Sequence, residues 1–470
     1  MPQSADIVVK EITDAGGIAV ANYDSCVEGQ AIIKTAIDNF GRIDVLINNA
    51  GILRDITFRN MSQQDWDLIQ EVHVTGPYRT SKAAWPYFRK QRYGRVITTS
   101  SSSGLFGNFG QSNYAAAKMA MLGLTFTLAK EGAKYGIHAN TLAPGAASRL
   151  TQTVWPPEMM EAMKPEWVVP LVGVLCHKSC TESGGIFEAG GGHFSKIRWE
   201  RAKGLLLRPD DSLTADAVMA NWDKIIDFKD ADHPNRVSNS MELLEKAMDL
   251  PPSKAVSNPI NFKGRVVLVT GGGAGLGRAY SHHFARLGAK VVVNDMKGAE
   301  DVAKEITDAG GQSLAIPVSV EQGADIVRQI IEKYGRIDII INNAGILRDK
   351  AFANMTDDMW NQVMAVHLNG TFAILKAAWP HMLKQKYGRV VNISSTSGIY
   401  GNFGQANYAS AVSIDIPRQT LAYGQTLTCF AENRSDRPDE VISQRRSEVQ
   451  HHRQCRSTQC WHKYDTNSET

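Results

Sequence analysis

The chain has 470 residues, of which 43% are hydrophobic and 21% are charged, and its formal net charge is +3. This charge is too small to argue for nucleic-acid binding, and the length allows two or three domains with their own cores. Six cysteines in a chain this long predict no disulfide framework, and no run of about 20 apolar residues predicts a membrane span.

The sequence contains a long internal repeat. Three pairs of matching blocks show it: KEITDAGG at 10–17 and 304–311, NNAGILRD at 48–55 and 342–349, and GNFGQ at 107–111 and 401–405. The offset is 294 positions each time, as 304 minus 10 shows, so the copies align without insertions over this stretch. A period this long indicates a duplicated domain rather than a solenoid.

The two copies differ in extent. Copy two begins with a segment, Asn261 to Val302, that has no counterpart in copy one. At the other end, copy two stops resembling copy one after Ala411, whereas copy one continues further. We therefore expect four parts: copy one at 1–195, a connector at 196–258, copy two at 259–411, and a non-homologous, disordered tail at 412–470.

Both copies alternate apolar, β-branched runs with amphipathic stretches. The runs that predict strands are IDVLINN at 43–49, RVITTS at 95–100, RVVLVT at 265–270, KVVVND at 290–295, IDIIINN at 337–343 and RVVNIS at 389–394. Alternating strands and helices predict a parallel sheet covered by helices on both faces. The expected fold class is α/β, as two incomplete Rossmann-like, doubly wound parallel-sheet domains in tandem.

The connector contains one stretch, 212–228, with an apolar helical stripe. We expect one amphipathic helix here, packed on a neighbouring domain rather than binding a separate partner. In the tail, His451, His452, Cys455, Cys460 and His462 could suggest a metal cluster. Their spacing matches no standard zinc pattern, so we predict no metal site.

A glycine-rich turn follows the predicted strand at 265–270. Its key positions are Gly271, Gly275, Leu276 and Gly277, and the next predicted strand ends in Asp295. Glycines let the backbone turn sharply and approach a pyrophosphate at a helix N-terminus. A tight structural turn is the lesser alternative, because this run lies between a predicted strand and a predicted helix. A carboxylate at the end of the next strand accepts hydrogen bonds from a ribose and repels a 2′-phosphate, which favours NAD over NADP.

A serine and a tyrosine recur at the same spacing in both copies. Ser101 lies thirteen residues before Tyr114, and Ser395 lies thirteen before Tyr408. Such a pair can converge on one substrate oxygen, which the serine holds while the tyrosine moves the proton. If YxxxK stood alone, a surface Tyr/Lys pair on a helix would be the preferred interpretation, because this spacing often occurs by chance.

The cation beside the tyrosine is present in copy one only. Lys118 lies one helical turn after Tyr114, whereas Val412 holds the matching position after Tyr408. We expect the Lys118 ammonium to favour the phenolate of Tyr114, because a nearby opposite charge lowers a phenol's pKa.

The sequence resembles the short-chain dehydrogenase/reductase family in the combination of four motifs: TGxxxGxG, NNAG, the serine and YxxxK. The blocks NNAGILRD, AAWP, YGRV and GNFGQxNY are similar to the tandem dehydrogenase region of the fungal peroxisomal multifunctional β-oxidation enzymes of type 2. The resemblance covers about residues 10–411 and implies NAD-dependent oxidation of (3R)-3-hydroxyacyl-CoA to 3-ketoacyl-CoA.

The resemblance also implies roles for individual residues. Those implied to be catalytic are Ser101, Tyr114, Lys118, Ser395 and Tyr408. Those implied to bind the cofactor are Gly271, Gly275, Leu276, Gly277, Asp295, Asn48, Asn342, Asp24, Lys118, Pro144 and Gly145. His73 and His367 occupy the position at which most members of the family have a catalytic asparagine.

The resemblance further implies an acyl-CoA substrate, no nucleic acid, and an intramolecular pseudo-dimer or a homodimer of dehydrogenase units. It implies a peroxisomal location. However, the chain ends in Ser-Glu-Thr rather than in a peroxisomal targeting tripeptide such as Ser-Lys-Leu, so a cytoplasmic location is the alternative. The N-terminal sequence also lacks the layout of a secretory signal.

Each copy departs from the family pattern. Copy one lacks a glycine-rich turn, copy two has Val412 in place of the lysine, and the hydratase domain of the family is absent. A truncated or misassembled gene model explains these gaps with one assumption, so we expect a fragment with impaired activity.

Three alternatives remain open. The chain could be an NAD-binding pseudoenzyme or assembly subunit, or a short-chain reductase of 3-ketoacyl or steroid substrates. Alternatively, the nucleotide unit of copy two could complete the sheet of copy one, although neighbours in sequence usually pair first.

Overall fold

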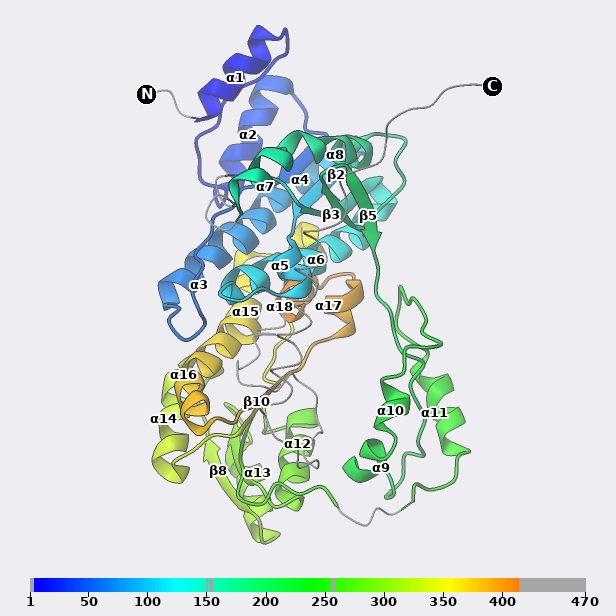
Figure 1. Ribbon diagram of the computed structural model, residues 1–470, viewed down its shortest axis with the longest axis vertical. Coiled ribbons are helices and arrows are strands. Elements are labelled where there is room, and N and C mark those ends of the chain that lie inside the picture. The colour runs from blue at the N-terminus through cyan, green and yellow to red at the C-terminus, as the bar shows by residue number, and fades with distance from the viewer. Residues whose placement is uncertain (1–3, 149–150, 152–154, 255–258, 414–470) are drawn as a thin grey trace, which may run out of the picture. The chain divides into compact units, whose positions relative to one another are not determined.

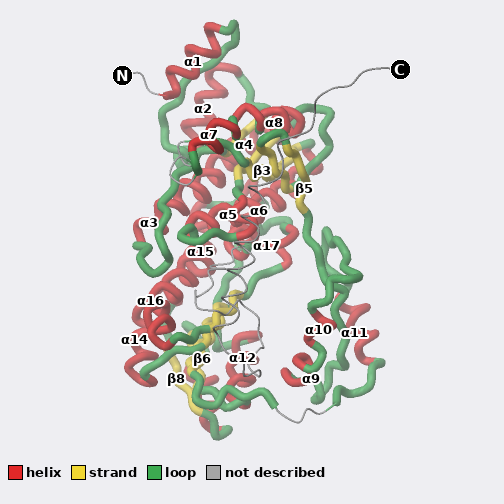
Figure 2. The backbone as a smooth tube through the Cα atoms, in the orientation of Figure 1, coloured by secondary structure: helices red, strands yellow, loops and turns green. Residues whose placement is uncertain are grey.

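The computed structural model describes residues 4–148, 151, 155–254 and 259–413, drawn in colour in Figure 1. Within these ranges each copy forms its own five-stranded sheet, with the strands drawn in yellow in Figure 2. The predicted α/β class with two tandem parallel-sheet domains is confirmed. The predicted tail and its histidines and cysteines lie outside the described residues.

Copy one builds its sheet in the order β1-β2-β3-β4-β5, parallel except for the antiparallel pair β4 and β5. Its strands are β1 (Val45–Asn48), β2 (Gly94–Thr99), β3 (Ile137–Pro144), β4 (Ile186–Gly190) and β5 (His193–Ile197). Its α-helices are α1 (Ser4–Asp14), α2 (Gly29–Phe40), α3 (Gln63–Gln70), α4 (Gly76–Gln91), α5 (Ser102–Phe106), α6 (Ser112–Gly132), α7 (Pro157–Ala162) and α8 (Val169–Cys176).

Copy two builds a fully parallel sheet in the order β10-β9-β6-β7-β8. Its strands are β6 (Val266–Thr270), β7 (Lys290–Asn294), β8 (Gln312–Ile316), β9 (Ile339–Asn342) and β10 (Arg389–Asn392). Its α-helices are α12 (Gly275–Arg286), α13 (Ala299–Asp308), α14 (Gly323–Tyr334), α15 (Asp357–Met364), α16 (Gly370–Gln385), α17 (Thr396–Tyr400) and α18 (Ala406–Val412). After β6, the chain adds β7 and β8 on one side of this strand and then β9 and β10 on the other. The boundary between β6 and β9 is therefore the topological switch point, where sheets of this type bind ligands.

The strand at the centre of copy two shows why its sheet forms within that copy. All five residues of β6 are buried, and β6 pairs with β9 through Val267 opposite Ile339 and Val269 opposite Ile341. In copy one, β1 is an edge of the sheet. The nucleotide unit of copy two therefore completes its own sheet, which argues against completion of the copy-one sheet within this chain.

The edge position of β1 changes the burial of matching residues. Val45 and Ile47 are 36% and 48% exposed, whereas their counterparts Ile339 and Ile341 are 4% and 5% exposed. The difference arises because β6 covers β9, while β1 has no strand on that side among the described residues. Identical strand patterns therefore acquire different environments in the two copies.

The two copies pack against each other through matching aromatic pairs. The Trp66 ring stacks on Phe372 with 4.1 Å between centroids, and the equivalent Trp360 stacks on Tyr78 at 4.0 Å. All four side chains are at most 1% exposed. The two copies of this chain are thus in contact through a repeated, buried aromatic pair.

Lysines repeat the same symmetry at this interface. Lys82 Nζ donates to the carbonyl oxygens of Phe352 and Ala353 at 2.7 and 2.8 Å. The equivalent Lys376 Nζ donates to those of Phe58 and Arg59 at 3.2 and 2.6 Å. Each copy therefore satisfies loop carbonyls of the other with an ammonium group.

The interface is asymmetric at one hydrogen bond, which leads to a prediction. Trp66 Nε1 donates to Asn369 Oδ1 at 3.0 Å, whereas Trp360 Nε1 is buried without a partner in the described part of the chain. The position matching Asn369 is Thr75. Thr75→Asn should give Trp360 an acceptor and raise the free energy of unfolding by about 1 kcal/mol, measured by urea denaturation.

The reverse change provides the control for this prediction. Asn369→Thr should remove the acceptor of Trp66 and lower the stability by about 1–3 kcal/mol, because a buried donor is left unpaired. Equal stability of both variants and the unchanged chain would contradict the assigned role of this hydrogen bond.

The connector differs from the prediction. Its expected single helix is divided into α9 (Ala215–Met219) and α10 (Trp222–Ile225), and a further helix, α11 (Ser240–Met248), follows. The break lies at Asn221, whose Nδ2 donates to the Ala217 carbonyl oxygen at 2.9 Å. An asparagine side chain competes for backbone partners in this way and interrupts a helix.

Candidate active site

Helix α6 positions the tyrosine and lysine of copy one. Tyr114 and Lys118 lie one turn apart, and the Lys118 Nζ is 5.4 Å from the centre of the Tyr114 ring. Ser101 precedes α5 as its N-cap, and its hydroxyl accepts the Ser103 N–H at 3.2 Å and is also hydrogen-bonded to the Tyr114 hydroxyl. The structure thus brings together the three residues predicted for copy one.

Lys118 is held in a buried position. Its side chain donates from Nζ to the Thr99 carbonyl oxygen at 2.7 Å, at the end of β2. Burial lowers the pKa of Lys118 to about 7, because a charged ammonium loses its hydration there. The amine is therefore poised to gain or lose a proton near neutral pH.

The pKa of Tyr114 departs from the expectation. Burial raises the pKa of the phenol, while the hydrogen bond with Ser101 lowers it and the charge of Asp55 raises it. The expectation that the Lys118 ammonium lowers this pKa is not met, because desolvation outweighs the other effects and the pKa is raised overall.

His73 lies beside this pair on a π-helical turn, η1 (Glu71–Thr75). Its ring meets that of Tyr114 edge-on at 5.1 Å, and its Nε2 lies 2.8 Å from the Ile52 carbonyl oxygen. Burial and the charge of Lys118 lower the pKa of His73 to about 3, so the imidazole is neutral. π-helical turns are often found at functional sites.

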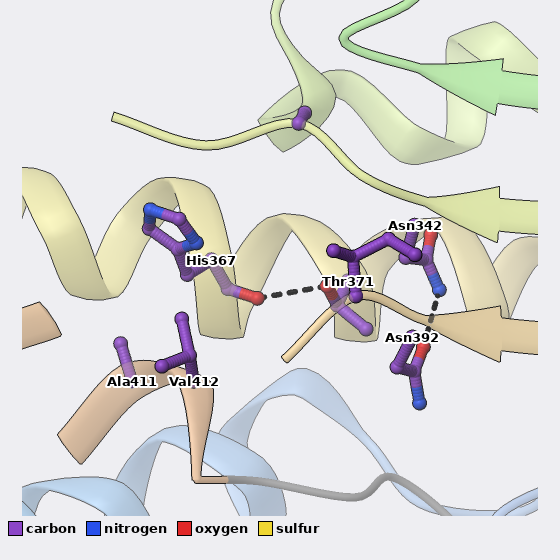
Figure 3. Close-up of a pocket in the computed structure, with 8 residues that line it drawn as sticks. Asn342, His367, Thr371, Asn392, Ala411 and Val412 are labelled. Carbon is purple, nitrogen blue, oxygen red and sulfur yellow. Dashed lines mark hydrogen bonds between the residues drawn. The ribbon is translucent and has the colours of Figure 1, made fainter. Parts of the chain in front are cut away.

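Copy two repeats this arrangement without the cation. Ser395 caps α17, Tyr408 lies on α18, and the His367 ring meets the Tyr408 ring edge-on at 5.1 Å. Val412 is buried at the position that matches Lys118. Figure 3 shows the Val412 and His367 side chains on the same side of the adjoining pocket.

The glycine-rich turn lies in copy two, between β6 and α12. A Cβ on Gly277 would lie 2.0 Å from the Gly271 carbonyl oxygen, and one on Gly273 would lie 2.1 Å from that of Lys297. Gly271 also has a φ of +62°, which only glycine adopts readily. The sequence requirement for glycine here is therefore steric.

Asp295 supports this turn from the end of β7. Its carboxylate accepts the N–H groups of Gly273 and Lys297, each at 3.1 Å. Asn343 ties the turn to β9, because its Nδ2 donates to the carbonyl oxygens of Thr270 and Gly271 at 3.0 and 3.2 Å. Leu276 is 63% exposed at the start of α12.

Comparison with known proteins identifies the family. A family model described as short chain dehydrogenase matches residues 3–158 and 265–412, which together are more than half of the chain.

The chain belongs to the short chain dehydrogenase family.

Membership of this family makes the chain an oxidoreductase by class and implies a nicotinamide cofactor, NAD or NADP.

Individual relatives are similar over most of this short chain dehydrogenase. The peroxisomal hydratase-dehydrogenase-epimerase of Neurospora crassa is 59% identical over 410 residues, which cover 87% of this chain and 46% of that protein. The protein of the same name from Saccharomyces cerevisiae is 51% identical, covering 87% of this chain and 47% of that protein. The mouse (Mus musculus) peroxisomal multifunctional enzyme type 2 is 51% identical, covering 54% of this chain and 35% of that protein. The chain therefore spans about half the length of the two fungal relatives.

The remaining predicted positions of this short chain dehydrogenase fall into two groups. Asn48 and Asn342 end β1 and β9; Asn48 Oδ1 accepts from Thr80 at 2.6 Å, and Asn342 Nδ2 donates to Asn392 Oδ1 at 2.9 Å. Pro144 ends β3, and the next residue, Gly145, donates its N–H to the Ala189 carbonyl oxygen at 2.8 Å.

Asp24 and the glycine-rich turn are not combined with the Tyr114 site. Asp24 is exposed and accepts a hydrogen bond from Asn22 Nδ2 at 2.8 Å. Gly271 to Gly277 adjoin the sheet of copy two, whereas Tyr114 and Lys118 adjoin that of copy one. Within the described residues, no sheet carries both the glycine-rich turn and a tyrosine–lysine pair.

Sequence reasoning missed the network that holds the tyrosine helices. Gln111 Nε2 donates to Asp55 at 2.8 Å, and Gln111 Oε1 accepts from the Ser103 hydroxyl at 2.7 Å. The matching Gln405 does the same with Asp349 and Ser397. The repeated ILRD and GNFGQ blocks were the available signal, because they supply the aspartate and the glutamine.

The part of the chain that the structure describes contains no cluster of His, Cys, Asp or Glu able to hold a metal ion. Over the same residues, no helix combines the length and apolar character needed to cross a bilayer.

Proposed function

We propose that this chain oxidises (3R)-3-hydroxyacyl-CoA to 3-ketoacyl-CoA with NAD, within peroxisomal fatty-acid β-oxidation. The observation that carries the proposal is the convergence of Ser101, Tyr114 and Lys118 in a chain closely similar to two proteins named peroxisomal hydratase-dehydrogenase-epimerase. The peroxisomal location and the acyl-CoA substrate rest on those names.

The residues of copy one suit the proton transfer of this oxidation. The Ser101 hydroxyl holds the substrate oxygen. Tyr114, whose pKa is raised by burial, accepts the hydroxyl proton once its phenol has been deprotonated, as the C3–H hydride leaves. Lys118, with its pKa of about 7, supports the charge of the phenolate when protonated. NAD, when bound, supplies the hydride acceptor.

The cofactor part of the proposal rests on copy two. At Gly271, Gly273 and Gly277 the surrounding atoms leave no space for a side chain. The bare backbone of this turn suits the close approach of a pyrophosphate. The Asp295 carboxylate beside the turn would repel a 2′-phosphate, so we assign Asp295 to selection of NAD. The assignments of Gly275, Leu276, Asn48, Asn342, Asp24, Pro144 and Gly145 to the cofactor belong to the same proposal.

Cofactor choice can be measured without any turnover. Titration of the purified chain by calorimetry should give binding of NAD at least tenfold tighter than binding of NADP. Asp295→Ala should reduce this ratio. Asp24→Ala should leave the ratio unchanged, because the family resemblance assigns Asp24 to the adenine, which NAD and NADP share. A preference for NADP would contradict the assignment of Asp295.

The activity is tested by mixing the purified chain with a (3R)-3-hydroxyacyl-CoA and NAD and recording NADH absorbance. We expect slow turnover, because the glycine-rich turn and the tyrosine–lysine pair belong to different sheets. That same separation favours a second candidate, an NAD-binding subunit without catalysis. NAD binding together with no turnover in either direction would support this second candidate and exclude the first.

The proposal also includes the division of the chain. We assign dehydrogenase copies to 1–195 and 259–411, joined by the connector at 196–258. Ser395 and Tyr408 are assigned to substrate contact in copy two, where the proton relay would be weak without a lysine.

A further inference from the structure

A pocket in copy two lies where copy one places the Lys118 side chain. The cavity has a volume of about 20 Å³ and opens to solvent on one side. Asn342, His367, Thr371, Asn392, Ile393 and Val412 contribute to its lining. Figure 3 shows Val412 and His367 at one end and Asn342 and Asn392 at the other.

The internal repeat shows what chemical group matches this space. In copy one, Lys118 Nζ donates to the Thr99 carbonyl oxygen at 2.7 Å, and its charge acts on the neighbouring His73. The residues that match Thr99 and His73 are Ile393 and His367, and both line the copy-two pocket. Val412 is too short to reach the Ile393 carbonyl oxygen as a lysine would, and its side chain carries no donor.

The polar lining favours a donor over an acceptor. Asn342 Nδ2 already donates to Asn392 Oδ1 at 2.9 Å, and the Thr371 hydroxyl donates to the His367 carbonyl oxygen at 2.8 Å. These two side-chain donors are therefore engaged, and none of the described residues that line the pocket is a lysine or arginine. Among these residues an anion would find no cation, whereas an amine would meet a backbone carbonyl oxygen.

We propose that copy two has a binding site for a small primary amine, which takes the place of the missing lysine side chain. The Ile393 carbonyl oxygen accepts its N–H, and the methyl or short alkyl group packs on the Val412 side chain. In copy one the Lys118 amine makes the equivalent contact, with the Thr99 carbonyl oxygen at 2.7 Å. This inference does not require that either copy be active.

The test uses methylamine as the probe and the intact chain. Line broadening of ¹³C-labelled methylamine should saturate with a dissociation constant on the order of 10 mM, close to the limit for a ligand of two heavy atoms. Val412→Lys should abolish the saturable broadening, because the introduced side chain occupies the site. Val412→Ala should retain it, since that change enlarges the pocket.

A matched variant in copy one tests the role of the repeat. Lys118→Val should create a second site of the same kind and increase the saturable amplitude about twofold. If Val412→Lys does not fold, Val412→Met fills the same space without a charge and should also abolish binding. Broadening that is equal in the unchanged chain and the filled variants, or no added site in Lys118→Val, would overturn the inference.

The binding result is separate from the proposed dehydrogenase activity. A chain that binds methylamine but does not turn over substrate would retain the amine site and lose the proposed function. Conversely, turnover without saturable methylamine binding would leave the proposed function and reject the site.

Discussion

Tyr114→Phe should lower the rate of NADH formation from a (3R)-3-hydroxyacyl-CoA by roughly 10²- to 10⁴-fold, the usual contribution of a positioned general acid or base. The phenylalanine ring preserves the edge-on contact with His73 at 5.1 Å and loses only the hydroxyl that meets Ser101. The affinity for NAD should remain unchanged, because the glycine-rich turn belongs to copy two. Steady-state kinetics and calorimetry measure these two quantities.

The same substitution in copy two is the internal control. Tyr408 has the matching histidine contact, with His367 at 5.1 Å, but Val412 stands where copy one has its lysine. Tyr408→Phe should therefore change the rate by less than about twofold. A large loss in Tyr408→Phe with none in Tyr114→Phe would move the proposed chemistry to the second copy.

Trp66→Ala should have the largest effect on stability. The side chain is fully buried, stacks on Phe372, and donates to Asn369 at 3.0 Å, so its removal leaves a cavity and an unpaired amide oxygen. Large-to-small changes of this type cost about 3–5 kcal/mol. The expected result is a lower midpoint of urea denaturation, followed by circular dichroism.

An exposed tryptophan supplies the control for that experiment. Trp167 is 47% exposed, and Trp167→Ala should change the free energy of unfolding by no more than about 0.5 kcal/mol. If Trp66→Ala proved equally mild, the pairing of the two copies would contribute little to the stability of the chain.

Local sequence pattern was sufficient for the central strands and insufficient at the sheet edges. The run at 265–270 predicts β6, which is confirmed, because all its residues are apolar or small and buried on both faces. In contrast, KEITDAGG is identical in both copies, yet only copy two continues into a paired strand, β8, after it. In copy one, residues 18–22 form no strand, since strand formation requires a neighbour that the local sequence does not encode.

For the candidate site, residue identity was more informative than geometry or electrostatics. The spacing of Tyr114 and Lys118 correctly places both on one helix face, and the repeat correctly matches Val412 to Lys118. The pKa of Tyr114 was predicted with the wrong sign, because burial depends on the surrounding fold and not on the four-residue spacing. The hydrogen bonds of Gln111 and Gln405 to distant aspartates likewise depend on contacts across the chain.

The aromatic contact between the copies has a consequence for how this molecule can vary. In a dimer of identical chains, one substitution alters both halves of an interface at once. Here Trp66 donates to Asn369, while the position that matches Asn369 in the other copy is Thr75, so each half carries its own residue. Covalent linkage also makes the pairing independent of protein concentration, because the second half is supplied at a high effective concentration by the first. The two halves can therefore diverge separately and still meet when the protein is dilute.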